Sequence, residues 1–143
     1  MKNDKTDNHE QIFWEEIDRL FPDMIKAIAS LSKKSYLSIT NLRTGITWWS
    51  ERAMDYFGMK ENYTIRSMEK ANRKIHPDDV ATFKRGFKER VDGKNLDTAW
   101  EYRIQDGDSY NRFNAMARVL YDEQKQPFII IIRYDNYGIS DEV

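Results

Sequence analysis

Cysteine is absent from this chain of 143 residues. Its absence excludes disulfides, thiolate nucleophiles, cysteine metal ligands and a flavin–cysteine adduct. Histidine is scarce, so only His9 and His76 could act as imidazole ligands. Long apolar runs are also missing, because the longest, residues 128–132, is far shorter than the roughly 20 residues of a membrane-spanning helix. Residues 1–10 lack the apolar centre of a signal peptide. We therefore expect a cytoplasmic chain without membrane insertion.

The chain also lacks an excess of charge of either sign, since 23 basic residues nearly balance 24 acidic ones. The most basic stretch, residues 84–92, interleaves lysine and arginine with Glu89 and Asp92, which is typical of a solvated helix face. Neither feature favours a nucleic-acid partner. The hydrophobic content of 40% and the length indicate one globular domain with its own core.

The N-terminal third predicts a tail and an amphipathic helix. Residues 1–9 are polar and are expected to be disordered. Residues 10–32 repeat apolar side chains every three or four positions, at Ile17, Leu20, Met24, Ile28 and Leu31. Pro22 lies within this helix, which must kink or restart there. The apolar stripe either packs on its own domain or pairs with a second copy in a dimer, and two heptads do not decide between these alternatives.

A hairpin and a short helix follow. Residues 36–40 and 46–49 alternate as strands do, and turn-forming residues separate them. Ser50 suits the N-cap of a helix over residues 51–57, and Gly58 suits its end. Residues 59–75 have no clear period and are expected to be irregular or weakly helical.

The segment His76-Pro77-Asp78-Asp79 predicts the start of the longest helix. Proline suits a first helical turn, and acidic side chains there complement the helix dipole. His76 is better placed to cap backbone N–H groups than to bind haem, and the long helix contains no other histidine. The two aspartates need no acid–base role. We therefore interpret the segment as structural and expect no metal site.

The last third predicts three antiparallel strands. Trp100, Tyr102 and Ile104 alternate with charged residues, so one face of that strand is buried. Asp106-Gly107 is a hairpin signal, and the next strand alternates around Phe113 and Ala115. Residues 128–132 are apolar on both faces, so this strand should be covered on both sides. Hairpins at both ends with helices between them indicate an α+β fold.

These motifs, in this order, resemble those of a PAS domain, specifically the subclass with Trp-Ser after the second strand and His-Pro-Asp-Asp before the long helix. The matching segments are Trp49-Ser50, Tyr56-Phe57-Gly58, Ile75 to Asp79, Glu101-Tyr102-Arg103, Tyr110 to Phe113, and Asp122 to Pro127. The resemblance covers residues 35–136. Three positions depart from the family pattern, namely Phe113 for tryptophan, Lys125 for glycine, and Asp135 to Tyr137 at the exit motif.

The resemblance implies a five-stranded antiparallel sheet with helices on one face, preceded by the N-terminal helix. It divides the chain into the tail, the helix of residues 10–32, a sensor domain of residues 33–136 and an exit linker of residues 137–143. It also implies a homodimeric sensor of bacterial type that signals to a cyclic-dinucleotide synthase or histidine kinase domain absent from this chain.

The cavity of such a domain can hold haem, a flavin, an organic acid or nothing, and the sequence identifies none of them. Ligation of haem by a helix histidine and a flavin–cysteine adduct are both disfavoured. The predicted pocket residues are Trp48, Phe57, Phe83, Phe87, Trp100, Tyr102, Phe113, Ala115, Ile130 and Ile132.

Three functions remain open at this point. The leading hypothesis is a non-enzymatic sensor that binds a small ligand or a partner and relays a signal. A ligand-free docking module with a filled interior is the alternative. An enzyme with a cone-shaped cavity would need an acidic side chain projecting into that cavity.

Overall fold

The computed structural model describes residues 5–32, 34–65 and 73–140. Its elements are, in chain order, α1 (Lys5–Leu20), α2 (Met24–Leu31), β1 (Tyr36–Asn41), β2 (Ile46–Trp49), α3 (Glu51–Phe57), β3 (Tyr63–Ile65), η1 (Pro77–Asp79), α5 (Val80–Val91), β4 (Trp100–Asp106), β5 (Ser109–Tyr121) and β6 (Pro127–Ile139). The order of helices and strands agrees with the α+β prediction.

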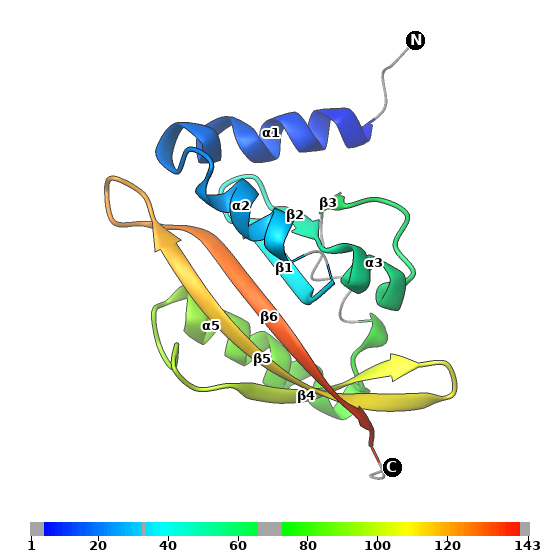
Figure 1. The fold of residues 1–143 in the computed structure, drawn as a ribbon. Helices are drawn as coiled ribbons and strands as arrows, with labels where there is room; N and C mark the ends of the chain where they lie inside the picture. The colour runs from blue at the N-terminus through cyan, green and yellow to red at the C-terminus, as the bar shows by residue number, and fades with distance from the viewer. Residues whose placement is uncertain (1–4, 33, 66–72, 141–143) are drawn as a thin grey trace.

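The strands form one antiparallel sheet in the order β3-β2-β1-β6-β5-β4 (Figure 1). The predicted antiparallel sheet is confirmed, but the predicted number of five strands is wrong, because the sheet has six. The additional strand is β3, which pairs with β2 through Trp48 and Tyr63. A three-residue strand is too short to show an alternating pattern, so β3 could not be recognised within residues 59–75.

The N-terminal helix differs from the prediction at its start, and in its middle it follows one of the two predicted alternatives. It begins at Lys5, inside the predicted tail, whose residues 1–4 lie outside the described part of the chain. The helix restarts near Pro22 instead of only kinking, because proline lacks the N–H that a continuous helix would need. Asp23 has a left-handed backbone with φ 66°, and α2 then begins at Met24.

Helices cover both faces of the sheet. On the inner face lie α3 and α5, as the resemblance implied for one face. On the outer face lie α1 and α2, which pack on the sheet of their own chain (Figure 1). The N-terminal segment is therefore part of the folded domain, since its buried residues complete a second core.

Two hydrophobic clusters result. The inner cluster contains Trp49, Ala53, Phe57, Ile75, Phe83, Trp100, Tyr102, Ile104, Phe113, Ala115, Ala117, Val119, Ile130, Ile132 and Tyr134. The outer cluster contains Phe13, Ile17, Ile25, Ala29, Leu37, Ile39, Ile46, Trp48, Tyr63, Phe128 and Ile129. Strand β6 contributes to both, which explains its run of apolar residues on both faces.

The C-terminal strand extends further than predicted. Ile139, placed in the exit linker by sequence, pairs with Asn111 as the last residue of β6. A register shift between Asn111 and Phe113 marks an irregularity there, and Gly138 takes φ 89° while its N–H donates to Oδ1 of Asn136 at 2.8 Å. Residues 141–143 of the predicted linker lie outside the described residues.

Candidate functional site

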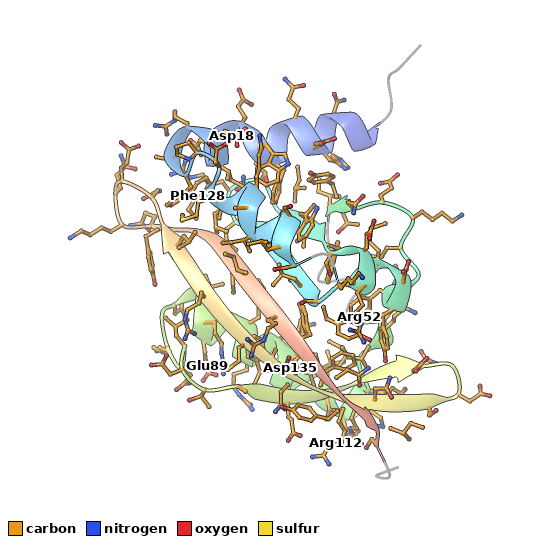
Figure 2. All side chains as sticks on the ribbon, in the orientation of Figure 1. Asp18, Arg52, Glu89, Arg112, Phe128 and Asp135 are labelled. Atoms are coloured by element: carbon orange, nitrogen blue, oxygen red, sulfur yellow. The ribbon has the colours of Figure 1, made fainter. Side chains whose placement is uncertain are left out.

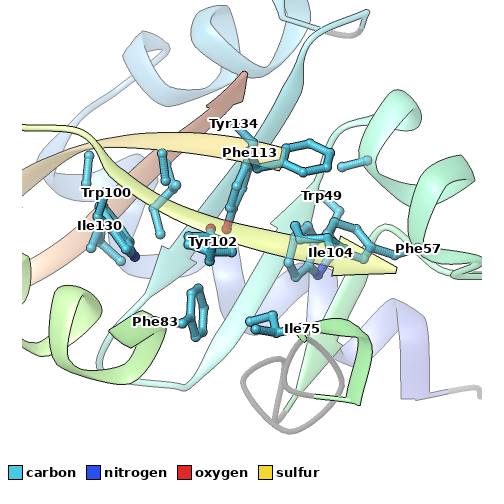
Figure 3. Close-up of a cluster of buried hydrophobic side chains, with 14 of the residues drawn as sticks. Trp49, Phe57, Ile75, Phe83, Trp100, Tyr102, Ile104, Phe113, Ile130 and Tyr134 are labelled. Atoms are coloured by element: carbon cyan, nitrogen blue, oxygen red, sulfur yellow. The ribbon is translucent and has the colours of Figure 1, made fainter. Parts of the chain in front are cut away.

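The inner face of the sheet brings together nine of the ten predicted pocket residues. Eight of them belong to the inner cluster, and Phe87 packs against it from α5. They come from α3, α5, β4, β5 and β6, so side chains distant in sequence converge on one side of the sheet (Figure 3).

Trp48 is the exception and lies in the outer cluster. Successive residues of a strand point to opposite faces, so β2 can present only one of its two tryptophans to each side. Trp49 takes the inner position and contacts the ring of Phe57, with ring centroids 5.4 Å apart. The inner face therefore holds Trp49, and Trp48 does not join the other nine predicted residues.

Aromatic rings fill much of the inner cluster. Phe113 meets the rings of Tyr36 and Tyr56 edge-on at centroid distances of 5.5 and 5.3 Å. Phe83 of α5 meets Tyr102 of β4 in the same way at 4.9 Å. Edge-to-face pairs at these distances are favourable beyond the area that they bury. This part of the interior is therefore closely packed by its own side chains.

The apolar interior also holds the hydroxyl groups of Ser38, Tyr102 and Tyr134. The hydroxyl of Tyr134 lies 3.2 Å from Oγ of Ser38, within hydrogen-bond distance. Burial raises the pKa of Tyr134 to about 12, and burial together with the neighbouring Tyr134 also raises the pKa of Tyr102. Both phenols therefore stay protonated near neutral pH and act as neutral donors or acceptors.

Helix α5 approaches β4 most closely at Gly86 and Arg90. A Cβ atom on Gly86 would lie 2.8 Å from Cδ1 and Nε1 of Trp100, so only glycine allows this contact. One turn later, the Arg90 guanidinium stacks on the same indole, 4.1 Å from the ring centroid. Its Nη1 donates to the Gly86 carbonyl at 3.3 Å. Trp100 thus contacts both Gly86 and the buried Arg90 guanidinium. Burial lowers the pKa of Arg90.

A cavity of about 450 Å³ opens beside the inner cluster, between α3 and the segment that leads to η1. Its lining residues are Phe57, Gly58, Met59, Lys60, Glu61, Thr64, Arg73 and Lys74. The volume falls within the range of small-molecule sites. Phe57 and Met59 provide apolar surface, while three basic side chains and one acidic side chain surround it. The cavity therefore suits a ligand with an apolar part and a negative charge.

The wall of this cavity is tied directly to the sheet. Nε1 of Trp49 donates to Oγ1 of Thr64 at 2.7 Å, which joins strands β2 and β3 at the cavity. Phe57 belongs both to the cavity wall and to the inner cluster. A ligand that displaced Phe57 or Thr64 would therefore act on Trp49.

The predicted dimer residues occupy three different environments. Ile17 is fully buried against the sheet of its own chain. Leu20 and Ile28 are partly buried at the edge of the outer cluster. Met24 and Leu31 are exposed, with 43% and 87% of their surface accessible. The stripe read from sequence therefore divides into a part that packs on its own domain and a part that faces solvent.

Specific polar contacts anchor α1 to the sheet. Nε1 of Trp14 donates to the Tyr63 hydroxyl at 2.7 Å, which links α1 to β3. The buried Asn41 donates from Nδ2 to the Phe13 carbonyl at 3.2 Å. Its Oδ1 accepts from the backbone N–H of Arg43 at 3.0 Å, so one side chain organises both the β1–β2 turn and the helix contact.

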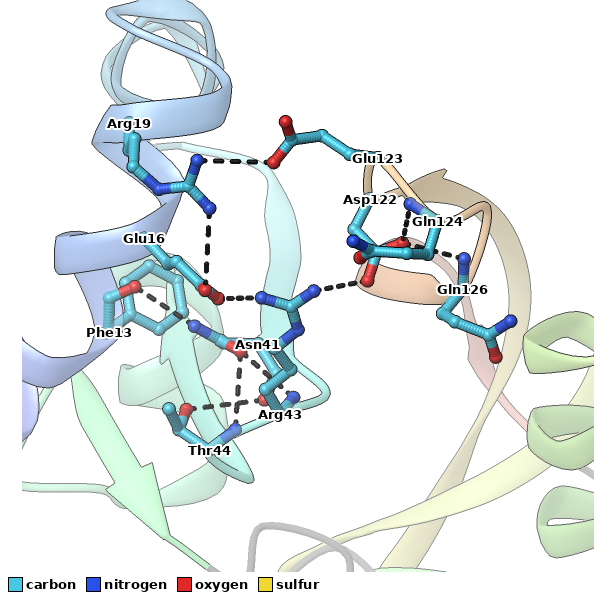
Figure 4. Close-up of polar contacts among 10 residues, drawn as sticks. All are labelled: Phe13, Glu16, Arg19, Asn41, Arg43, Thr44, Asp122, Glu123, Gln124 and Gln126. Carbon is cyan, nitrogen blue, oxygen red and sulfur yellow. Dashed lines mark hydrogen bonds and ion pairs between the residues drawn. The ribbon is translucent and has the colours of Figure 1, made fainter.

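An ion-pair network extends this anchoring to the β5–β6 turn. Arg43 binds both Glu16 of α1 and Asp122, and Arg19 binds Glu123 at 3.2 Å (Figure 4). Backbone hydrogen bonds, led by the one from Gln126, together with the Arg43 guanidinium, lower the pKa of Asp122. The network therefore connects helix α1 with the turns at one end of the sheet.

The His76 segment has a structural role at the rim of the inner face. Nδ1 of His76 accepts a hydrogen bond from the Asp78 N–H at 3.1 Å, so the side chain caps η1. Asp79 binds the Arg103 guanidinium at 2.8 and 3.0 Å and its backbone N–H at 2.9 Å. These hydrogen bonds, chiefly those of the guanidinium, lower the pKa of Asp79. The pair fastens the start of α5 to β4.

Two further findings concern residues 5–32, 34–65 and 73–140 only. In that part of the chain, no three His, Cys, Asp or Glu side chains gather closely enough to hold a metal ion. Every helix there is too short or too polar to cross a bilayer.

Several residues of the cavity were missed by the sequence reasoning. Met59, Lys60, Thr64, Arg73 and Lys74 lie in the segment for which no period was recognised. Their proximity depends on the turn after α3 and on β3, neither of which has a distinctive pattern. The only available signal was Gly58, which ends α3 with φ 67° and turns the chain toward the cavity.

Comparisons with known proteins agree with this architecture. A sequence model of the PAS fold matches residues 46–132, which is more than half of the chain. No curated protein sequence matches.

Solved structures with the same fold are distant in sequence. A sensory box histidine kinase/response regulator from Burkholderia thailandensis has a TM-score of 0.60 at 16% identity, over 78% of this chain and 83% of that one. The N-terminal domain of a diguanylate cyclase with a PAS/PAC sensor from Marinobacter aquaeolei has a TM-score of 0.60 at 15% identity, over 73% and 96%. A PAS domain from Colwellia psychrerythraea has a TM-score of 0.58 at 18% identity, over 81% and 98%. The sequence match and the shared architecture together establish that this chain belongs to the PAS-fold family.

Proposed function

We propose that this chain is a non-enzymatic sensory module that binds a small anionic ligand in the cavity beside Phe57 and relays its presence to helices α1 and α2. The output would be a histidine kinase or cyclic-dinucleotide synthase domain of a longer protein. Similar domains in the solved structures come from a sensory histidine kinase and a diguanylate cyclase. A cysteine-free sequence is compatible with a cytoplasmic setting.

The observation that carries the proposal is the placement of two consecutive tryptophans on opposite faces of β2. Trp49 contacts the cavity wall through Phe57 and Thr64. Trp48 lies in the outer cluster with residues of α1 and α2. A ligand that shifts β2 from the inner side would therefore move the contacts of the N-terminal helices directly, because no other element of the described chain lies between β2 and those helices.

The class of ligand follows from the cavity lining. Lys60, Arg73 and Lys74 can pair with a carboxylate or phosphate, and an arginine offers two parallel N–H donors to either group. Phe57 and Met59 give the remaining body of the ligand an apolar contact. An organic acid or an organic phosphate with a short apolar part satisfies both requirements.

The relay requires two arrangements of the sheet and its outer helices. A ligand shifts their populations only to the extent that it binds one arrangement more tightly. Phe57 is the group through which that preference would act, because it touches both the ligand cavity and Trp49.

The test measures binding and relay on the same protein. Thermal unfolding is followed in the presence of a panel of short-chain organic acids and organic phosphates. A ligand at 100 times its Kd stabilises the folded state by about 2.7 kcal/mol, which raises Tm by several degrees. Hydrogen exchange is then measured for α1 and α2 with and without the ligand, and we expect it to change.

Charge and relay variants sharpen the test. Arg73→Glu should abolish stabilisation, whereas Lys84→Glu, which makes the same charge change on an exposed face of α5, should not. Trp49→Leu should still bind but lose the exchange response of α1. If no panel member stabilises the protein and native mass spectrometry shows only the bare chain, the ligand proposal fails.

A ligand-free docking module is the second candidate. It is favoured by the dense packing of the inner cluster, in which Phe113, Ala115 and Ile130 are completely buried. A chain that retains no small molecule but captures a partner domain would support this alternative.

A further inference from the structure

A second hollow, of about 250 Å³, lies where strand β1 begins. It shares no lining residue with the cavity beside Phe57, and the two lie at opposite ends of helix α3. Its lining comes from the approach to β1, the start of α3 and the middle of β6 (Figure 2). We call it the basic hollow, and its charged residues are Lys34, Arg52, Arg133 and Asp135.

The charges around the basic hollow do not balance. Three of these residues are basic and one is acidic, so the lining has a net charge of +2 in a chain whose net charge is −1. The acidic residue, Asp135, already pairs with Arg133, whose Nη2 lies 3.2 Å from its Oδ2. Within the described chain, neither Lys34 nor Arg52 has a carboxylate at ion-pair distance. Two cations therefore line the hollow without a counter-ion.

Arg52 is held in position by groups that do not neutralise its charge. Its guanidinium carbon lies 4.5 Å from the centroid of the Tyr36 ring, and its Nη1 donates to the Lys34 carbonyl at 3.2 Å. Tyr36 in turn meets the rings of Tyr56 and Phe113 edge-on, at centroid distances of 5.8 and 5.5 Å. Ordering a long side chain opposes binding, and these contacts reduce that cost because they order the guanidinium in advance.

The backbone beside Lys34 is attached to the start of α3. Oγ of Ser50 donates to the Ser35 carbonyl and accepts from the Leu37 N–H at 3.1 Å. Lys34 and Arg52 therefore belong to two segments that hydrogen bonds join. Ser35 also lines the hollow and carries a hydroxyl group. The basic hollow is thus a preformed site, with two cations on a shared frame.

The net charge and the size of the hollow indicate the class of ligand. A phosphate monoester carries a charge of about −1.5 to −2 at pH 7, nearly twice that of a monocarboxylate. The volume lies just below the roughly 300–1,000 Å³ of drug-sized sites, so it suits a phosphate group with a small substituent. We propose that the basic hollow binds a small phosphate dianion, held by Arg52 and Lys34. The site is independent of the ligand proposed for the cavity beside Phe57.

The experiment titrates the isotope-labelled chain with inorganic phosphate and follows its backbone amide shifts by NMR. We expect saturable shifts at residues 34–36, at Arg52 and at residues 133–136. Arg52→Gln should weaken binding at least about tenfold, because it removes a charge-assisted contact that arginine makes through two parallel N–H groups. Arg85→Gln is the matched control, since Arg85 is an exposed helix arginine without an ion pair among the described residues. It should bind as the native chain does, and thermal unfolding confirms that both variants fold.

Two further variants test the charge argument in opposite directions. Lys34→Gln removes a cation but keeps the carbonyl that positions Arg52, so it should weaken binding without disturbing the Tyr36 contact. Asp135→Asn removes the acidic side chain of the hollow and frees Arg133, so it should tighten binding about threefold. Charges with a purely structural role would give no such gain.

The choice of anion identifies the ligand and separates this site from the proposed function. Glycerol phosphate that binds more tightly than inorganic phosphate assigns the hollow to a monoester, and the reverse assigns it to free phosphate. The site is overturned by an absence of saturable shifts, by shifts confined to the cavity beside Phe57, by binding that Arg52→Gln leaves unchanged, or by acetate that binds as tightly at equal ionic strength. Arg73→Glu should leave phosphate binding here intact, so the basic hollow stands even if the sensory ligand proves wrong.

Discussion

The inner and outer faces of the sheet differ in how the polar groups at their helix–sheet contacts are satisfied. On the inner side, Arg90 Nε, Trp100 Nε1 and Tyr102 Oη are buried without a partner in hydrogen-bond geometry within the described chain. On the outer side, the Trp14 indole N–H has a partner, and Asn41 uses both its donor and its acceptor. Figure 2 shows the side chains of both layers around the same strands.

This difference indicates which face can rearrange. Each buried polar atom without a partner costs about 1–3 kcal/mol, so the inner arrangement is not the best that its own groups could achieve. A ligand or a shifted side chain that satisfies one of them gains that free energy. On the outer side, Nδ1 of His9 and Oδ1 of Asn114 also lack a partner within the described chain, but the polar groups that hold α1 to the sheet are paired. The contacts of α1 are therefore better suited to carry a movement than to initiate one.

The largest expected effect is at the closest contact of the inner face. Gly86→Val should lower the free energy of unfolding by about 3 kcal/mol, because its side chain would overlap the Trp100 indole at the 2.8 Å position of the Cβ. Valine has a better helix propensity than glycine, so a purely local effect would be stabilising. Urea unfolding measures the sign directly. In a Trp100→Leu background the penalty should largely disappear, and an equal penalty in both backgrounds would show that the contact does not limit the packing.

On the outer face, the decisive side chain is Asn41. Asn41→Ala should cost about 2 kcal/mol, since it removes a buried donor and acceptor that hold both α1 and the β1–β2 turn. Asn41→Asp keeps the acceptor for the turn but turns a second oxygen toward the Phe13 carbonyl. We therefore expect it to speed hydrogen exchange in α1 while the turn stays protected. Equal exchange of both segments would mean that α1 is held by its apolar contacts alone.

A pH titration probes the rim of the inner face. Arg103 lowers the pKa of Asp79, so the stability that this pair contributes is present above the ordinary aspartate pKa of about 3.9 and is lost as pH falls through the lowered value. Asp79→Asn should cost about 1–2 kcal/mol at pH 7 and should flatten the acid limb of the stability curve. Asp78→Asn, one residue earlier and exposed, is the control and should leave that limb unchanged.

Most of the fold could be predicted because its strong elements have local signatures. Ser50 and Gly58 bounded α3 at the observed residues, and the alternation around Trp100 and Tyr102 gave the buried face of β4. The faces of β2 could not be assigned in the same way. All four of its side chains are buried, so alternation of polarity is absent and Trp48 could not be distinguished from Trp49.

The polar anchors could not be predicted for a different reason. Asn41 looked like an ordinary turn residue, and its bond to Phe13 depends on the docking of α1. Lys125 was recognised only as a departure from a family glycine. The structure gives the reason for the glycine, since the position has a left-handed backbone with φ 64°. Such contacts are set by tertiary structure, which sequence periodicity does not encode.

The smallest effect is expected for the ion-pair network that fastens α1 from outside. Arg43→Met removes the bonds to Glu16 and Asp122 but keeps an apolar stem over the Phe128 ring, which the guanidinium now covers at 4.7 Å. The pair with Glu16 is half-exposed and contributes little to global stability, and the buried Asp122 carboxylate keeps its hydrogen bonds from the backbone N–H groups of Gln124 and Gln126. The unfolding curve should therefore barely move. Hydrogen exchange near the end of α1 should still quicken, because the network acts on that helix and not on the core. Arg112→Met breaks the exposed pair with Glu101 on the strands of the other half of the sheet and should leave α1 unchanged. If both variants speed hydrogen exchange in α1 equally, the ion-pair network does not act specifically on that helix. The proposed difference between the two faces is then wrong.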